Sequence, residues 1–169
     1  MTPHYGLTFV QLIRAPFTDV NMVWGIVPLY FALLLNELTS TKANFRTAIQ
    51  TGFSFLWASA QWAYFYAKWS PSTNVSAMAA STRPINLVVT LLVFLVGLVA
   101  LYCGLRRRYP RYGSFLGRTR FGNYFMITLY PIQAHYLVWT WERLIAIVLF
   151  AVPVWLVLHF GLMPFRGRK

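Results

Sequence analysis

Residues 105–124 read Leu-Arg-Arg-Arg-Tyr-Pro-Arg-Tyr-Gly-Ser-Phe-Leu-Gly-Arg-Thr-Arg-Phe-Gly-Asn-Tyr, with six arginines and no acidic residue. A long apolar segment, residues 85–105, comes directly before them. A basic cluster that follows an apolar segment of membrane length is retained on the cytoplasmic side of a membrane. This stretch therefore predicts an integral membrane protein, and it fixes the expected orientation of the helices.

The composition of the whole chain indicates lipid as its solvent. Of the 169 residues, 58% are hydrophobic and only 11% are charged, whereas a soluble domain carries about 25% charged residues. The formal net charge is +12, but the positive charges cluster at the ends of apolar segments, so we expect no nucleic-acid partner. The single cysteine, Cys103, excludes an internal disulfide and a multi-cysteine metal site.

The chain is predicted to form one all-α transmembrane domain, residues 1–169, built as a bundle of about five helices. An N-terminal segment, residues 1–19, is expected to lie at the membrane interface, with Pro16 ending its helix. Residues 70–84 are interpreted as an outer surface loop and residues 106–122 as the basic cytoplasmic loop. The expected spans are residues 20–38, 47–67, 85–105, 123–140 and 144–164.

The number of spans depends on residues 123–165, which are too long for one crossing of about 20 residues. The alternative to two spans here is a re-entrant or interfacial segment broken at Pro131, followed by one span. With five spans, eleven Lys and Arg lie inside and four lie outside. This bias favours five spans, with the N-terminus outside and the C-terminus inside. The expected location is a bacterial or archaeal cytoplasmic membrane, with an organelle inner membrane as the alternative.

The arginines of the basic loop are candidates for binding anionic lipid head groups, because basic clusters beside a span attract such lipids. The alternative is that they serve only as a topology signal. The candidate residues are Arg106, Arg107, Arg108, Arg111, Arg118 and Arg120.

Two stripes of polar and small residues recur at helical spacing on the second and third spans. Small residues let helix backbones approach, and amides form hydrogen bonds between helices, so we expect the two stripes to pack on each other. The alternative is a polar pathway for a neutral solute, lined by Gln50, Gln61 and Asn86. The stripes consist of Gln50, Ser54, Trp57 and Gln61 on the second span and of Asn86, Thr90, Gly97, Ala100 and Gly104 on the third.

His135, in the expected fourth span, is the candidate for a buried titratable group, since ionisable groups inside spans are costly and often functional. No His, Cys or acidic pair has the spacing of a metal site, and we expect neither a metal nor a cofactor. The chain holds only three acids, Asp19, Glu37 and Glu142. We therefore expect no catalytic residues, although His135 and Glu142 could share a pocket.

The residues Gly117-Arg118 and Asn123-Tyr124 resemble a short pattern that opens a span in some multi-span envelope acyltransferase-like proteins. The charged catalytic residues of those enzymes have no counterpart here, and we assign no family. The sequence instead favours a small non-catalytic membrane subunit, whose expected partners are membrane lipids and either other integral subunits or a second copy of the chain. A homo-oligomeric pore or carrier is the first alternative, and an envelope lipid- or glycan-modifying enzyme is the second.

Overall fold

The computed structural model describes residues 4–39, 45–68, 75–106 and 120–162, which are 92% helical with no strand among them. The all-α class predicted from the sequence is confirmed. The elements are α1 (Tyr5–Arg14), the 3-10 helix η1 (Ala15–Thr18), α2 (Val20–Thr39), α3 (Phe45–Lys68), α4 (Val75–Arg106), α6 (Arg120–Gln133) and α7 (Trp141–Gly161).

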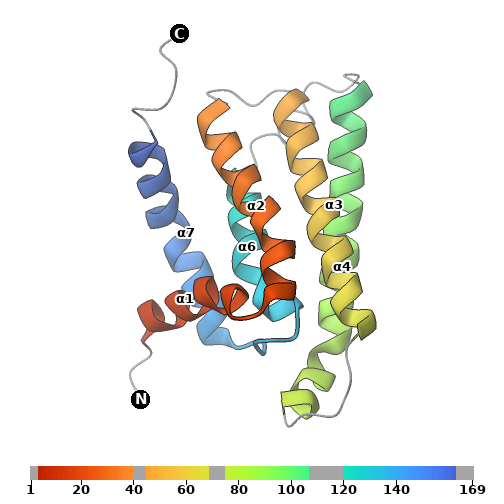
Figure 1. Cartoon of the computed structure of the whole chain (residues 1–169), viewed down its shortest axis with the longest axis vertical. Coiled ribbons are helices and arrows are strands. Elements are labelled where there is room, and N and C mark those ends of the chain that lie inside the picture. Colours follow the sequence, from red (N-terminus) through yellow and green to blue (C-terminus); the bar gives the residue numbers. More distant parts are fainter. Residues whose placement is uncertain (1–3, 40–44, 69–74, 107–119, 163–169) are drawn as a thin grey trace.

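Five helices, α2, α3, α4, α6 and α7, run along the long axis of the molecule, and α1 lies across one end of them (Figure 1). The chain bends by 114° between the segment Tyr5–Thr18 and the start of α2. Asp19 stabilises the new helix at this bend, because its Oδ1 accepts a hydrogen bond from the backbone N–H of Asn21 at 2.8 Å. The crosswise placement of α1 is the one that an interfacial helix adopts.

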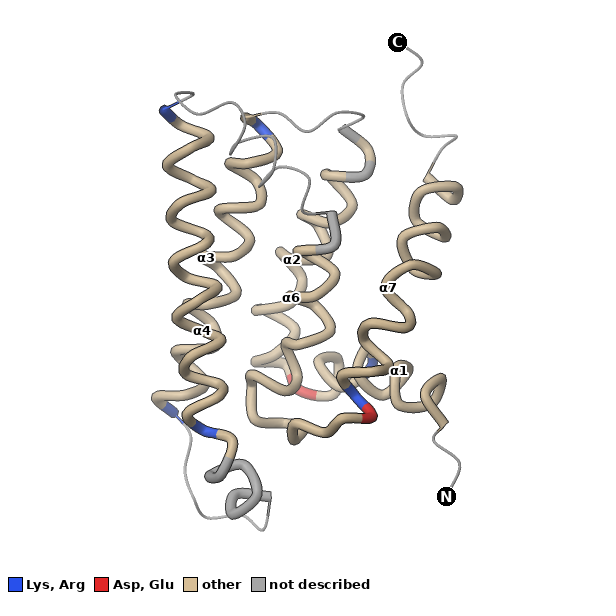
Figure 2. The backbone as a smooth tube through the Cα atoms, turned by 180° about the vertical axis from the view of Figure 1, so that it is seen from behind, with Lys and Arg blue, Asp and Glu red and all other residues tan. Residues whose placement is uncertain are grey.

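The charged residues lie near the ends of the helices (Figure 2). Arg46 is in the first turn of α3 and Arg106 is the last residue of α4. Lys68 and Arg83 lie toward the opposite ends of the same two helices. The middle of the described bundle is therefore free of Lys, Arg, Asp and Glu, as expected where a hydrocarbon layer surrounds it.

In the described part of the chain, two helical segments are long and apolar enough to cross a membrane, Thr82–Arg106 of α4 and all of α7. A third crossing results if the bent pair Tyr5–Thr18 and Val20–Asn36 counts as one span. These segments support a membrane protein. The five crossings and the orientation of the termini stay predictions.

Three of the five expected spans do not pass this test alone. The span expected over residues 20–38 passes only together with Tyr5–Thr18, and the other two, in α3 and α6, fail for physical reasons. The polar residues of α3 face inward, where Thr51, Ser54 and Ser59 are at most 2% exposed, while Phe53 and Tyr64 are exposed. The mean hydropathy of α3 averages its buried polar face with its exposed apolar face, so the helix fails although its outer face is apolar. Helix α6 has 14 residues, which correspond to about 21 Å, against about 30 Å for the hydrocarbon core.

The helix boundaries differ from the expected ones at two places, and the other described helix ends agree within three residues. Helix α4 begins at Val75, so residues 75–84, expected as a loop, are helical. Their Ser, Thr and Ala residues are compatible with a helix once Pro84 is accommodated within it. The helix expected over 123–140 ends at Gln133, and residues 134–140 are not helical.

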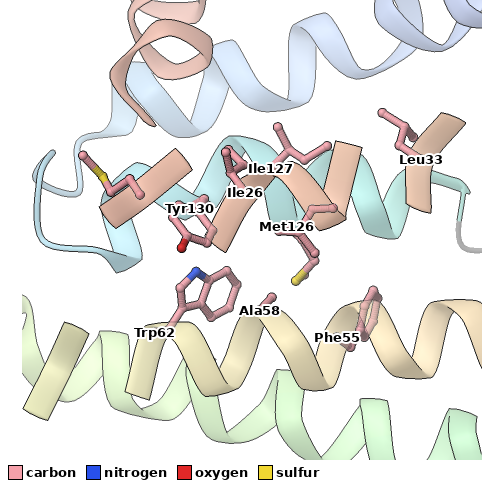
Figure 3. Close-up of a cluster of buried hydrophobic side chains, with 10 residues drawn as sticks. Ile26, Leu33, Phe55, Ala58, Trp62, Met126, Ile127 and Tyr130 are labelled. Carbon is pink, nitrogen blue, oxygen red and sulfur yellow. The ribbon is translucent and has the colours of Figure 1, made fainter. Parts of the chain in front are cut away.

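The main core is an apolar layer in which α2, α3 and α6 meet. Figure 3 shows its side chains converging from the three helices, and at one end the hydroxyl of Tyr130 and the indole nitrogen of Trp62 point toward one another. Side chains in this layer include Ile26, Leu29 and Leu33 from α2, Phe55 and Ala58 from α3, and Met126 and Ile127 from α6.

A second core cluster joins α1 to α6 and α7. Leu12 of α1 is completely buried there, together with Ile132 and Ala151. The hydroxyl of Tyr124 on α6 donates a hydrogen bond of 2.7 Å to the backbone carbonyl of Ile147 on α7. This cluster attaches α7 to the bundle near the end where α1 crosses it (Figure 1).

Candidate functional site

The chain makes an unusual turn directly after α6, at His135. Its φ of 61° makes it the one non-glycine residue of the described segments with positive φ. The backbone N–H of His135 donates to the carbonyl of Ile132 at 3.1 Å, and that of Tyr136 donates to the carbonyl of Pro131 at 3.0 Å. These two bonds form a Schellman motif, in which glycine usually occupies the position of His135. The left-handed conformation costs a residue with a Cβ about 1–2 kcal/mol.

The turn places the imidazole of His135 against α4. The Nδ1 atom of His135 lies 3.1 Å from the side-chain nitrogen, Nδ2, of Asn86. The indole N–H of Trp139 donates to the side-chain oxygen, Oδ1, of the same asparagine. Asn86 is only 2% exposed. Its side chain connects His135 and Trp139, both in the segment after α6, to helix α4.

Further polar and aromatic groups surround this chain of hydrogen bonds. The ring of Tyr66 on α3 lies 6.1 Å from that of His135, and the guanidinium of Arg83 lies 4.9 Å above the ring of Tyr66. The hydroxyl of Thr90 donates to Oε1 of Gln133 at 3.4 Å. The site therefore combines residues of α3, α4, the end of α6 and the turn that follows.

The electrostatic environment favours the neutral form of His135. Burial lowers the pKa of the imidazole from its ordinary value of 6.5, and the positive charge of Arg83 lowers the pKa further. The site can therefore hold a neutral, hydrogen-bonded imidazole near neutral pH and can respond to acid.

The carboxylates of Glu142 and Asp19 form hydrogen bonds away from His135. Glu142, which the sequence placed within reach of His135, accepts a hydrogen bond of 2.9 Å from the hydroxyl of Thr8 on α1. Asp19 caps α2. No group of three or more His, Cys, Asp or Glu in the described segments has the arrangement of a metal site.

The small residues of the predicted stripe on α4 lie on its contact with α3. A Cβ added to Gly97 would lie 3.2 Å from the carbonyl oxygen of Gly52, and one added to Gly104 would lie 3.0 Å from the backbone nitrogen of Ile49. Ala100, between the two glycines on the same stripe, is completely buried. The two backbones approach closely because these positions lack larger side chains.

Two residues of the polar stripe of α3, in contrast, lie against α2. The indole N–H of Trp57 donates to the carbonyl of Gly25 at 2.9 Å, and Oε1 of Gln61 lies 3.2 Å from where a Cβ on Gly25 would be. Ser54 donates within its own helix to the carbonyl of Gln50 at 2.8 Å. The expectation that the two stripes pack on each other is therefore wrong for Trp57 and Gln61. The absence of a side chain on Gly25 opens the backbone of α2 to these polar groups.

Only part of the predicted lipid-binding cluster falls on described residues. Arg106 is exposed at the end of α4, with its guanidinium 6.0 Å from the ring centre of Tyr102. Arg120 is the first residue of α6. The remaining arginines, Arg107, Arg108, Arg111 and Arg118, lie outside the described residues.

Sequence reasoning identified His135 and Asn86 separately and did not join them. Trp139, Gln133 and Arg83 are not among the candidate residues that the sequence indicates. The available signal was one polar group on α4, at Asn86, and two in the segment between α6 and α7, at His135 and Trp139. The turn that brings them together could not be predicted, because no glycine follows α6.

No protein family, curated protein or solved structure matches this chain.

Proposed function

We propose that this chain is a small non-catalytic integral subunit of a larger membrane assembly, which packs on partner helices and binds anionic lipid head groups through its basic loop. In this proposal α2, α3, α4, α6 and α7 each cross the membrane. The N-terminus and α1 lie on the outer side, and the C-terminus lies inside.

The observation that carries the proposal is the bare apolar surface of α4 and α7. Of the residues in the most apolar part of each helix, only 22% in α4 and 17% in α7 are buried within the chain. On α7, Val148 and Val157 are 66% and 71% exposed, and on α4, Leu91 and Leu92 are each 56% exposed. Such surfaces are stable only against lipid or other apolar helices.

The use of the polar groups supports a structural role over a catalytic one. Glu142 and Asp19 connect or cap helices, and Asn86 joins α4 to the following turn. Acid–base catalysis needs titratable groups that converge on a substrate. In the described segments, Glu142 and Asp19 instead join α1 to α7 and cap α2.

Cysteine labelling tests the proposed topology. In a background that lacks Cys103, a membrane-impermeant reagent should label Ser76→Cys from outside and leave Ser114→Cys protected until the membrane is opened. Gly167→Cys should also be protected, since an odd number of spans places it inside. Labelling of both Ser76→Cys and Gly167→Cys from outside would exclude five spans, and labelling of Ser114→Cys without Ser76→Cys would invert the orientation.

Site-specific photo-crosslinking tests the subunit role. A photoreactive residue at Val157 or Leu92, in native membranes, should form an adduct with one defined protein at a fixed stoichiometry. The matched control is Ala146, which is completely buried within the chain and should yield no adduct with another protein. Adducts with lipid alone at both exposed positions, together with a monomeric mass in mild detergent, would contradict the subunit proposal.

A further inference from the structure

The hydrogen bonds around Asn86 fix the proton on His135. An indole nitrogen can only donate, so the side-chain atom of Asn86 that faces Trp139 must be its oxygen. The amide nitrogen of Asn86 then faces Nδ1 of His135 at 3.1 Å. An amide NH2 group can also only donate, so Nδ1 must be an acceptor. The neutral imidazole therefore carries its proton on Nε2.

We propose that Trp139, Asn86 and His135 form an acid-sensitive latch, which holds the turn after α6 against α4 while His135 is neutral and releases it when Nδ1 takes a proton. Three side chains and two hydrogen bonds make up the latch. It goes beyond the proposed subunit function and does not depend on it, because the same contacts exist whichever partner the protein has.

A rotation of the Asn86 side-chain amide cannot restore both hydrogen bonds after Nδ1 of His135 is protonated. A proton on Nδ1 places two donors face to face, that of the imidazolium and the amide NH2 of Asn86. If the amide of Asn86 turns over, its oxygen accepts from His135, but its NH2 group then meets the donor-only indole of Trp139. One buried donor is unsatisfied in either orientation, and an unsatisfied buried donor destabilises the docked turn.

The charges around the imidazole act in the same direction. Arg83 on α4 is a cation and opposes a second positive charge on His135. Tyr66, on α3, presents its aromatic ring, and the carboxylate of Glu142 at the start of α7 accepts a hydrogen bond from Thr8. The released turn therefore binds more protons than the docked one, so the docked state loses stability as the pH falls below the ordinary histidine pKa.

The size of the effect follows from proton linkage. From about pH 6.5 downward, the ratio of released to docked turn should rise by up to about tenfold per pH unit, until the pH reaches the lowered pKa of the docked imidazole. Above about pH 7.5 the ratio should be constant, because the imidazole is then neutral in both states.

Nitrogen NMR on protein labelled at histidine, in detergent micelles, tests the tautomer. His135 is assigned by the loss of its signals in His135→Asn. At pH 7.5 we expect an unprotonated Nδ1 and a protonated Nε2. Hydrogen exchange of residues 134–140 then reports the docking of the turn, and after correction for intrinsic rates it should increase between pH 7.5 and 5.5. A proton on Nδ1 at pH 7.5, or exchange independent of pH, would overturn the latch.

The variant Asn86→Asp inverts the expected pH dependence. An aspartate accepts from Trp139 and also from a protonated Nδ1, so the turn should become better protected as the pH falls from 7.5 to 5.5. Asn86→Leu is the matched control, and it should expose the turn equally at both pH values. If Asn86→Asp retained the pH dependence of the unchanged protein, the asparagine would not be the sensor and the proposal would fail.

Trp139→Phe gives an independent test if a variant at Asn86 does not fold. Without the indole donor, Asn86 can turn its oxygen toward the protonated imidazole at little cost. The difference in exchange between pH 7.5 and 5.5 should therefore shrink, although the turn stays docked. An undiminished difference in Trp139→Phe would contradict the latch.

Discussion

Gly52 on α3 and Gly97 on α4 face each other at close range. A Cβ added to Gly52 would lie 2.9 Å from the carbonyl oxygen of Gly97, and a Cβ added to Gly97 would lie 3.2 Å from the carbonyl oxygen of Gly52. A Cβ on Gly52 would also lie 2.7 Å from the backbone nitrogen of Leu101. Backbone atoms cannot move aside as the end of a flexible side chain can. The contact between the two helices therefore requires a residue without a side chain at position 52.

Gly52→Ala should destabilise the protein by about 1–3 kcal/mol, because the added methyl group forces the backbones of α3 and α4 apart. The melting temperature in detergent measures the loss. Gly6→Ala is the matched control, since a Cβ on Gly6 meets nothing within 4 Å. Alanine in an open helical position gains about 0.5–1 kcal/mol over glycine. Equal effects of the two substitutions would show that α3 and α4 are not packed as described.

Two tyrosines of α6 should respond oppositely to the loss of their hydroxyl groups. Tyr124→Phe removes the 2.7 Å hydrogen bond to Ile147 and should cost about 1 kcal/mol. Tyr130 is completely buried, and its hydroxyl has no hydrogen-bond partner among the described residues. Tyr130→Phe should therefore be neutral or stabilising. Unfolding of both variants under the same conditions measures the difference, and a larger loss in Tyr130→Phe would contradict this assignment.

Gly25 leaves the space that the Tyr130 hydroxyl occupies. A Cβ on Gly25 would lie 1.6 Å from the hydroxyl oxygen and 2.7 Å from the ring carbon that carries it. Gly25→Ala should therefore be strongly destabilising, and the loss should be smaller when Tyr130→Leu is also present. A double-mutant cycle on melting measures this coupling, which we expect in the range of about 0.5–3 kcal/mol. Additive losses would mean that the two residues are not in contact.

The apolar layer between α2, α3 and α6 predicts that the protein conducts nothing by itself. Phe55, Met126 and Ile127 fill the space between the three helices (Figure 3), and a pore needs a continuous polar or water-filled path. Purified protein in liposomes should therefore move neither ions nor small neutral solutes above background, as measured by dye release and swelling. A flux that Gln61→Leu abolishes would replace the subunit proposal with the pore alternative.

The sequence predicted the helical class and most helix ends, because apolar segments of membrane length alternate with charged ones. It could not predict where α6 ends. The residue that ends α6 is a histidine in a left-handed conformation, and the usual signal for such an end is a glycine. Residues 75–84 were misread for a related reason, since Ser and Thr favour loops in isolation and yet continue α4.

The packing of the stripes was predictable only in part. Helical periodicity places Trp57 and Gln61 on one face of α3, but it carries no information about which neighbouring helix meets that face. The carbonyl of Gly25 decides this, because it is the acceptor for the Trp57 indole. On α4, the small residues indicate the face that packs on a neighbouring helix. Only a close approach of another helix backbone leaves no cavity beside Gly97 and Gly104.

The inward-facing polar residues of α3 have a consequence for how the protein enters the membrane. A segment is inserted according to the apolarity of its whole surface, because its neighbours are not yet present. With Thr51, Ser54 and Ser59 on one side, α3 is a poor substrate for insertion alone, whereas the apolar part of α4 that follows is a strong one. On the proposed topology, the two helices would enter the bilayer together as a hairpin during synthesis, with α4 drawing α3 in and the contact at Gly52 and Gly97 already formed.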